Sequence, residues 1–260
     1  MKYAGIWEPI KIEKDEMVSI QLGSLDLWIH RGAQEWHVAS EHRTDEMERL
    51  SVSRCREMAD LEWTRWMINE QVDEIKLHPC MPDRPVIVRP EMPISLLPNQ
   101  SVQFYIGVPV WVGVSLDDRF HNITEVPTMI LSNSWFGPTT EGELCYAMRT
   151  TAKLRQEDLQ PHPHRAVVPF EIRNASDETL DFARLCMHTS SLRIYQGRER
   201  MWTNQGRATY RGEDKWSRVV YARSAPPYDD AGRMVGKARE PVDRGAILRT
   251  FDNWKNLADF

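Results

Sequence analysis

Short segments in which apolar and polar residues alternate constrain this chain more than any other feature of its sequence. Near the N-terminus they are MVSIQLG (Met17 to Gly23), LDLWIH (Leu25 to His30) and EWHVAS (Glu35 to Ser40). Alternation with a period of two places the apolar side chains on one face of a strand. Gly23-Ser24, between the first two segments, is typical of a tight hairpin turn. Residues 1–81 are therefore predicted to form a β meander.

The same pattern continues through the second half of the chain. AVVPFEIRN (Ala166 to Asn174) and TLDFARLCMH (Thr179 to His188) alternate on either side of the polar turn ASDE. Further short segments, separated by glycines, continue to Tyr221. Many short strands at this spacing are typical of a sandwich. We predict an all-β fold in which residues 82–222 form an antiparallel β-sandwich.

Two stretches interrupt this pattern. Six prolines between Pro79 and Pro98 exclude a helix or a central strand there, so a domain boundary is expected near residue 82. Residues 223–244 are polar, contain Pro and Gly, and are predicted to be a linker. The remaining residues, 245–260, are expected to form a short amphipathic helix with the stripe Ile247, Phe251, Trp254 and Ala258. That stripe would pack on its own domain, a second subunit or another protein.

Charge and hydropathy exclude several classes of function. The formal net charge is -5 and no basic block is present, so no nucleic-acid partner is expected. The longest apolar run, Phe104 to Val114, is about half the roughly 20 residues needed to span a bilayer, and the N-terminus lacks a signal-peptide pattern. We therefore expect a cytoplasmic protein without membrane insertion. Its four cysteines form no C-x-x-C pair and are interpreted as buried thiols.

Three stretches of the sequence resemble a known family. They are NSWFGPTTEGELCYAMRT, the Pro-rich LHPCMPDRPVIVRPE that precedes it, and AVVPFEIRNASDETLDFARL that follows it. Together they resemble the prokaryotic family catalogued as domain of unknown function 432, over about Trp63 to Tyr221. The resemblance implies a β fold with an aromatic-Gly-Pro turn, and it implies no chemistry.

The stretch from Ser132 to Thr150 has two interpretations. In one, Cys145 is a nucleophile assisted by Glu141 or Glu143, which requires an accessible thiol with a lowered pKa. In the other, the stretch is a hairpin whose loop is shaped by Gly137-Pro138 and Gly142. Cys145 lies in an apolar run without a neighbouring histidine, so the hairpin is favoured.

A metal site is a further hypothesis. His162 and His164 are two residues apart, as are Cys186 and His188, so each pair would share one face of a strand. Four nitrogen and sulfur ligands from adjacent strands would suit zinc. The carboxylates of apparent turns, together with exposed tryptophans, would suggest another alternative, a carbohydrate-binding module.

We therefore expect a non-enzymatic module that acts through protein–protein contact and self-association, with no cofactor. Aromatic anchors dominate such interfaces. The expected contact residues are Trp202, Trp216, Phe251 and Trp254. The main alternative is a metal- or ligand-binding protein or an enzyme that uses a Cys/His cluster. That cluster would contain Cys145, His162, His164, Cys186 and His188.

Overall fold

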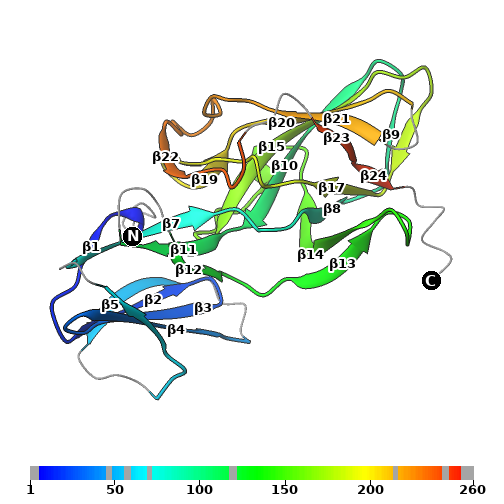
Figure 1. The fold of residues 1–260 in the computed structure, drawn as a ribbon. Helices are drawn as coiled ribbons and strands as arrows, with labels where there is room; N and C mark the ends of the chain where they lie inside the picture. The colour runs from blue at the N-terminus through cyan, green and yellow to red at the C-terminus, as the bar shows by residue number, and fades with distance from the viewer. Residues whose placement is uncertain are drawn as a thin grey trace. The chain divides into compact units, whose positions relative to one another are not determined.

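A computed structural model of the chain describes most of its residues (Figure 1). These are residues 6–44, 49–55, 60–68, 72–116, 122–212, 216–241 and 246–252. The chain forms two compact units. Unit 1 consists of residues 1–80, 109–130 and 162–164, and unit 2 consists of residues 81–108, 131–161 and 165–260. The chain first leaves unit 1 between Cys80 and Met81 and returns to it twice, at residues 109–130 and 162–164.

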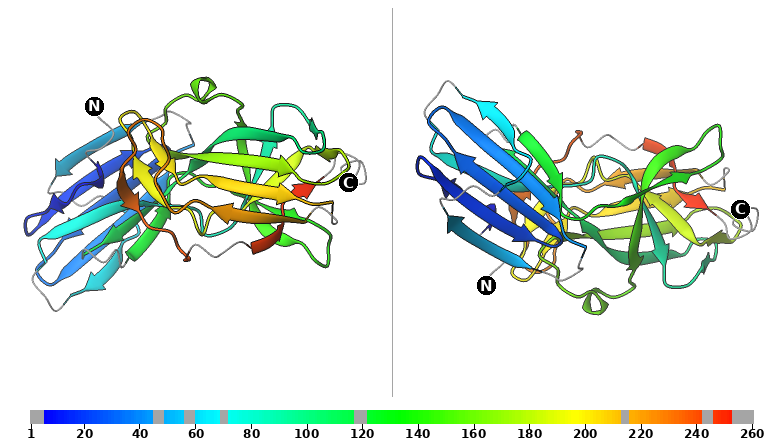
Figure 2. Two further views of the ribbon diagram at one scale, coloured as in Figure 1. Left: turned by 90° about the horizontal axis from the view of Figure 1, so that it is seen from above. Right: turned by 90° about the horizontal axis from the view of Figure 1, so that it is seen from below.

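The predicted meander is a five-stranded antiparallel sheet of unit 1, whose strands lie side by side in Figures 1 and 2. The strand order is β5 (Leu50–Cys55), β2 (Glu16–Leu22), β3 (Leu25–Arg31), β4 (Glu35–His42) and β6 (Thr64–Met67). Leu22 pairs with Leu25, so Gly23 and Ser24 form the two-residue turn that the sequence predicted. Gly23 has φ 61, a conformation that favours glycine.

A second sheet of unit 1 contains four strands. Their order is β1 (Ile10–Lys11), β7 (Glu74–Cys80), β11 (Trp111–Ser115) and β12 (Asn122–Pro127).

The alternating apolar residues of β2 and β3 in the five-stranded sheet, among them Val18, Ile20 and Leu27, are fully buried. Burial of these side chains is the main free energy that opposes the entropy cost of ordering the strands.

Unit 2 contains an eight-stranded sheet that is not purely antiparallel. Its order is β22 (Arg233–Gly236), β18 (Ile194–Gln196), β19 (Met201–Thr203), β15 (Arg165–Asn174), β20 (Gly206–Tyr210), β21 (Trp216–Tyr221) and β23 (Ala246–Arg249), and β10 (Ser101–Pro109) also pairs with β15. β15 runs parallel to β19 and to β20. The all-β prediction is confirmed, but the prediction of a purely antiparallel arrangement is wrong, because pairing partners depend on contacts distant in sequence.

A five-stranded sheet of unit 2 carries the residues of the candidate site. Its order is β13 (Ser132–Phe136), β14 (Glu143–Ala152), β8 (Val86–Pro90), β17 (Arg184–Met187) and β24 (Phe251–Asp252). β13 and β14 form the predicted hairpin, and β14 runs parallel to β8. β8 is the central strand of this sheet, so the prediction that the proline-rich segment contains no central strand is wrong. Its paired residues lie between Pro85 and the strand end at Pro90. A separate two-stranded sheet pairs β16 (Leu180–Phe182) with β9 (Ile94–Leu96).

Aromatic rings from different sheets meet in the core of unit 2. The Phe251 ring of β24 lies 5.0 Å from that of Phe182 in β16 and 6.1 Å from that of Tyr210 in β20. Phe182 also meets Phe104 of β10, with 6.4 Å between ring centroids. These contacts join the eight-stranded, five-stranded and two-stranded sheets through buried apolar surface.

The prediction of a C-terminal helix is wrong for the part of residues 245–260 that the structure describes. Residues 246–252 form β23 and β24, which pair with β21 and β17. Ile247 and Phe251 are four residues apart, a spacing that places side chains on one face of a strand as well as of a helix. Trp254 and Ala258, which would have distinguished the two, lie outside the described residues.

The segment expected to be a linker, residues 223–244, contributes to unit 2. Part of it is strand β22, which pairs with β18. Asp229 accepts hydrogen bonds at Oδ2 from the backbone N–H groups of Glu199 (3.0 Å) and Arg200 (3.2 Å). Strand pairing and the Asp229 carboxylate therefore tie to unit 2 a segment whose composition is typical of a flexible linker.

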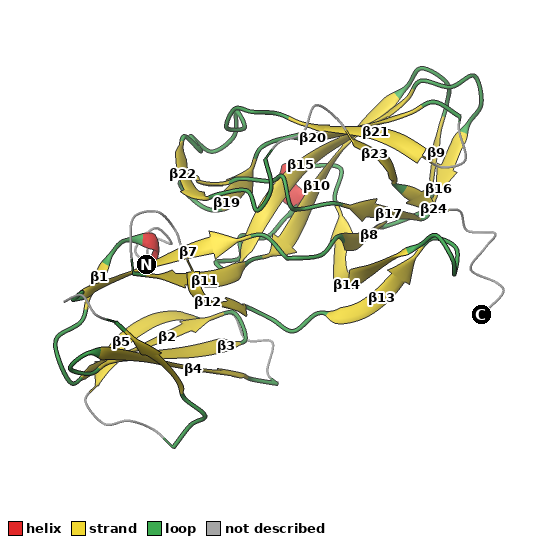
Figure 3. Ribbon diagram, in the orientation of Figure 1, coloured by secondary structure: helices red, strands yellow, loops and turns green. Residues whose placement is uncertain are grey.

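Helical structure in the described residues is limited to short turns such as η2 (Gln156–Asp158), drawn red in Figure 3. Among these residues no helix has the length and apolar character needed to cross a membrane.

Candidate functional site

Two strands of the five-stranded sheet bring four chemically active side chains together. Glu143 and Cys145 are two residues apart on β14 and share one face. Cys186 lies on β17, and His188 follows two residues later. β8 lies between the two strands in the sheet order, and its Ile87 pairs with both Ala147 and Cys186.

The hairpin of β13 and β14 fixes the position of Glu143 and Cys145. Phe136 pairs with Glu143, and Ser134 pairs with Cys145. The indole N–H of Trp135 donates a hydrogen bond to the carbonyl oxygen of Pro138 at 3.0 Å, across the loop. Gly142 allows this, since a Cβ there would lie 2.3 Å from the Trp135 indole nitrogen. The aromatic-Gly-Pro loop thus has a structural role, and the hairpin interpretation is confirmed.

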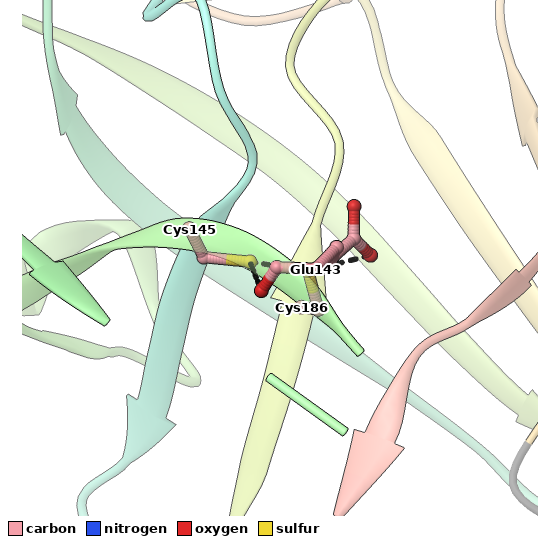
Figure 4. Close-up of side chains that lie close together, drawn as sticks. All are labelled: Glu143, Cys145 and Cys186. Carbon is pink, nitrogen blue, oxygen red and sulfur yellow. Dashed lines mark hydrogen bonds between the residues drawn. The ribbon is translucent and has the colours of Figure 1, made fainter. Parts of the chain in front are cut away.

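The sulfur and oxygen atoms of three of these residues converge (Figure 4). The Sγ atoms of Cys145 and Cys186 are 3.6 Å apart, and Cys186 Sγ is 3.7 Å from Oε1 of Glu143. One ligand atom from each of the three residues lies within 4.8 Å of the other two. No other group of three or more His, Cys, Asp or Glu residues in the described part of the chain meets this criterion.

Burial differs between the thiols and the carboxylate. Cys145 and Cys186 are buried with Ile87 and Phe136 in an apolar cluster, whereas Glu143 is partly exposed. The hydrogen bond with Cys145, burial and the charge of Glu143 raise the pKa of the Cys186 thiol well above its ordinary value.

His188 joins the cluster through Glu143. Its Nε2 lies 3.0 Å from Oε2 of Glu143, and its buried Nδ1 has no hydrogen-bond partner. The hydroxyl of Tyr221 donates a hydrogen bond to the backbone oxygen of His188. Burial of that hydroxyl raises the pKa of Tyr221. The backbone of the segment after β17 is therefore tied to β21.

The structure brings together only part of the predicted metal set. Cys186 and His188 lie in unit 2, where each contacts Glu143, whereas His162 and His164 belong to unit 1, where their ring centroids are 5.7 Å apart. Cys145, from the alternative enzyme hypothesis, lies beside Cys186. The residue that sequence reasoning left out of the metal set is Glu143. The Glu-x-Cys spacing of Glu143 and Cys145 could have identified it, because Cys186 and His188 were grouped on the same two-residue spacing.

The expected contact residues are only partly described. Trp202 and Phe251 are buried inside unit 2, so in this conformation neither side chain is available at the surface. The backbone of Trp216 lies in β21, but its side chain, like the whole of Trp254, is outside the described residues. Carbohydrate binding requires at least two exposed coplanar rings. Trp135 is the one aromatic among the large apolar side chains that are well exposed in the described residues.

Comparison with known proteins identifies a family but no activity. The sequence matches the family described as "Protein of unknown function (DUF432)" over residues 6–255 of its 260 residues. No curated protein and no solved structure matches the chain. The match confirms the resemblance found in the sequence and extends it on both sides of Trp63 to Tyr221. Because it spans nearly the whole chain, the protein belongs to the DUF432 family, whose function is unknown.

Proposed function

We propose that this protein is a non-enzymatic metal-binding module whose unit 2 holds one zinc ion at Cys145, Cys186 and Glu143. The observation that carries the proposal is the convergence of one ligand atom from each residue within 4.8 Å. Cysteine, histidine and carboxylate ligands are the set that zinc uses in proteins. Two sulfur ligands also favour a soft or borderline cation over magnesium or calcium, which prefer oxygen.

The separation of the two sulfur atoms agrees with ligation of one metal ion and is too long for a disulfide. Sulfur atoms about 2.3 Å from a tetrahedral zinc are about 3.8 Å apart. The observed distance between Cys145 Sγ and Cys186 Sγ is 3.6 Å. A disulfide needs about 2.05 Å, and none of the four cysteines forms one.

Catalysis by a cysteine nucleophile has less support. A nucleophilic thiol needs a lowered pKa and access to substrate. Cys186 has a raised pKa, and both thiols are buried. A metal bound by these residues would have its largest effect on folding and stability.

Native mass spectrometry of protein titrated with zinc tests the proposal. We expect one zinc per chain, which Cys145→Ser and Cys186→Ser each abolish or strongly weaken. Cys80→Ser is the control for a buried thiol outside the site, and Cys55→Ser the control for an exposed one. Glu143→Gln should weaken binding, whereas Glu141→Gln, on the adjoining loop, should not. Zinc that binds equally well to the double variant Cys145→Ser/Cys186→Ser would refute the proposal.

Self-association is a second candidate function, favoured by the free side of β13. In the described strands β13 pairs only with β14, so it forms an edge of its sheet. Trp135 and Leu144 pair across the hairpin and are 47% and 43% exposed. An exposed edge with apolar side chains is suited to pairing with the same strand of a second copy about a twofold axis.

Light scattering coupled to size-exclusion chromatography tests this second candidate. We expect wild-type protein to form dimers and Leu144→Lys to shift the mass towards the monomer of 30.4 kDa. Met92→Lys, an exposed apolar position of unit 2 outside the hairpin, is the matched control. A wild-type protein that is monomeric at all concentrations would exclude self-association.

A further inference from the structure

We infer that His188 is the fourth ligand of this zinc site, so that the site is closed and structural rather than open and catalytic. The inference rests on the proposed zinc site. Structural zinc sites have four protein ligands, whereas catalytic sites have three and leave one position for water or substrate. The identity of the fourth ligand therefore decides what the metal can do.

The distances around Glu143 support a site made of two cysteines, one glutamate and one histidine. A nitrogen and an oxygen bound to tetrahedral zinc at about 2.0–2.1 Å lie about 3.3–3.4 Å apart. His188 Nε2 is 3.0 Å from Glu143 Oε2. The separation of Cys186 Sγ and Glu143 Oε1, 3.7 Å, and that of the two sulfur atoms, 3.6 Å, are also close to ligand–ligand distances.

His188 would bind the metal through Nε2, the nitrogen that faces the Glu143 carboxylate. A neutral imidazole binds metal through either nitrogen. Nδ1 is buried without a hydrogen-bond partner and takes no part in the proposed site.

A small movement is required for His188 to reach the metal. Glu143, Cys145 and Cys186 each have a ligand atom within 4.8 Å of those of the other two. His188 is not part of this group. The imidazole must therefore turn towards the thiols on binding. The hydrogen bond from the Tyr221 hydroxyl ties the backbone carbonyl oxygen of His188 to β21.

A closed site would have a mechanical consequence within unit 2. Zinc would join β14 to β17 and to the segment after it, although β8 separates the two strands in the sheet. β17 also pairs with β24, at Leu185 and Phe251. The metal would thus stabilise the part of the sheet on which the C-terminal strand packs.

Absorption spectroscopy of the full chain loaded with Co²⁺ tests the inference. Co²⁺ reports thiolate ligation by charge-transfer bands and tetrahedral geometry by intense visible bands. For wild-type protein we expect both sets of bands, unchanged when azide or imidazole is added, because no position is open. His188→Gly should bind Co²⁺ at least about 10-fold more weakly. Added imidazole should restore the wild-type spectrum, while His162→Gln should behave as wild type.

The outcomes separate this inference from the proposed function. If thiolate bands appear but azide shifts the wild-type spectrum, the site has an open position and His188 is not a ligand. An unchanged spectrum in His188→Gly would overturn the inference in the same way. The absence of thiolate bands from wild-type protein would instead overturn the zinc site itself. The azide titration uses wild-type protein alone, so it decides the matter even if the variant does not fold.

Discussion

Gly142 shows at the scale of one residue how the hairpin depends on the absence of a side chain. A Cβ at this position would lie 2.3 Å from the Trp135 indole nitrogen and 2.6 Å from the carbonyl oxygen of Phe136. We expect Gly142→Ala to lower the free energy of unfolding by about 1–3 kcal/mol. Urea denaturation measures this change. Gly232→Ala is the control, since its nearest contact would be 3.9 Å away, and equal effects of the two variants would contradict the account.

His30 makes the stability of unit 1 depend on pH. Its Nδ1 lies 3.1 Å from that of His37 on the neighbouring strand. Burial and the charge of His37 lower the pKa of His30, and they outweigh the opposite effects of Asp15 and Glu35. In the unfolded chain the pKa returns towards about 6.5. The unfolded state therefore binds more protons than the folded state below that pH. The free energy of unfolding decreases as the pH falls from about 6.5 towards the lowered pKa of His30 in the folded state.

We expect the urea midpoint of unit 1 to fall between pH 7.5 and pH 5.5. Amide hydrogen exchange in β3 and β4, corrected for the intrinsic effect of pH, should report the same loss. His30→Gln should reduce the dependence on pH. Stability of β3 and β4 that increases on acidification would be the opposite of this expectation.

At the scale of an element, the C-terminal segment stabilises unit 2 through strand pairing and one buried ring. Phe251 is fully buried against Phe182 and Tyr210. We expect Phe251→Ala to cost about 3–5 kcal/mol, the usual range for a deleted core ring. Leu97→Ala, at a 61% exposed position, should change stability by no more than about 0.5 kcal/mol. A small effect at Phe251, measured by urea denaturation, would mean that β24 is not part of the core.

The sequence predicted local strands well and their partners poorly. β2, β3 and β4 agree with the alternating segments to within one or two residues, because period and turn residues are local properties. The parallel pairing of β14 with β8 has no local signal, because it joins segments about 60 residues apart. Residues 246–252 were predicted to be helical because Ile247 and Phe251 are four residues apart. That spacing places side chains on one face of a helix or of a strand.

The candidate site was predictable only in part. The Cys-x-His spacing predicted two side chains on one face of a strand; in the structure Cys186 lies on β17, His188 follows the end of that strand, and both contact Glu143. That Cys145, 41 residues earlier in the chain, meets Cys186 depends on the order β14–β8–β17. Glu143 was considered as a helper of a Cys145 nucleophile and not as a metal ligand, yet it is the first residue of β14 and its carboxylate lies 3.7 Å from Cys186 Sγ.

At the scale of the whole molecule, the zinc hypothesis belongs to unit 2 alone. Glu143, Cys145, Cys186 and His188 all lie in that unit. The first three are on strands of one sheet, and His188 follows the end of β17. Unit 1 contributes the meander, a four-stranded sheet and the pH-dependent histidine pair. We therefore propose that a metal ion stabilises one sheet of unit 2 in this DUF432 protein.

X-ray absorption at the zinc K-edge of zinc-loaded protein tests the central claim most directly. We predict two sulfur scatterers at about 2.3 Å and two nitrogen or oxygen scatterers at about 2.0–2.1 Å. The double variant Cys145→Ser/Cys186→Ser should lose the sulfur shell. A wild-type spectrum with only nitrogen and oxygen scatterers would mean that the two cysteines do not bind zinc, and the claim would be wrong.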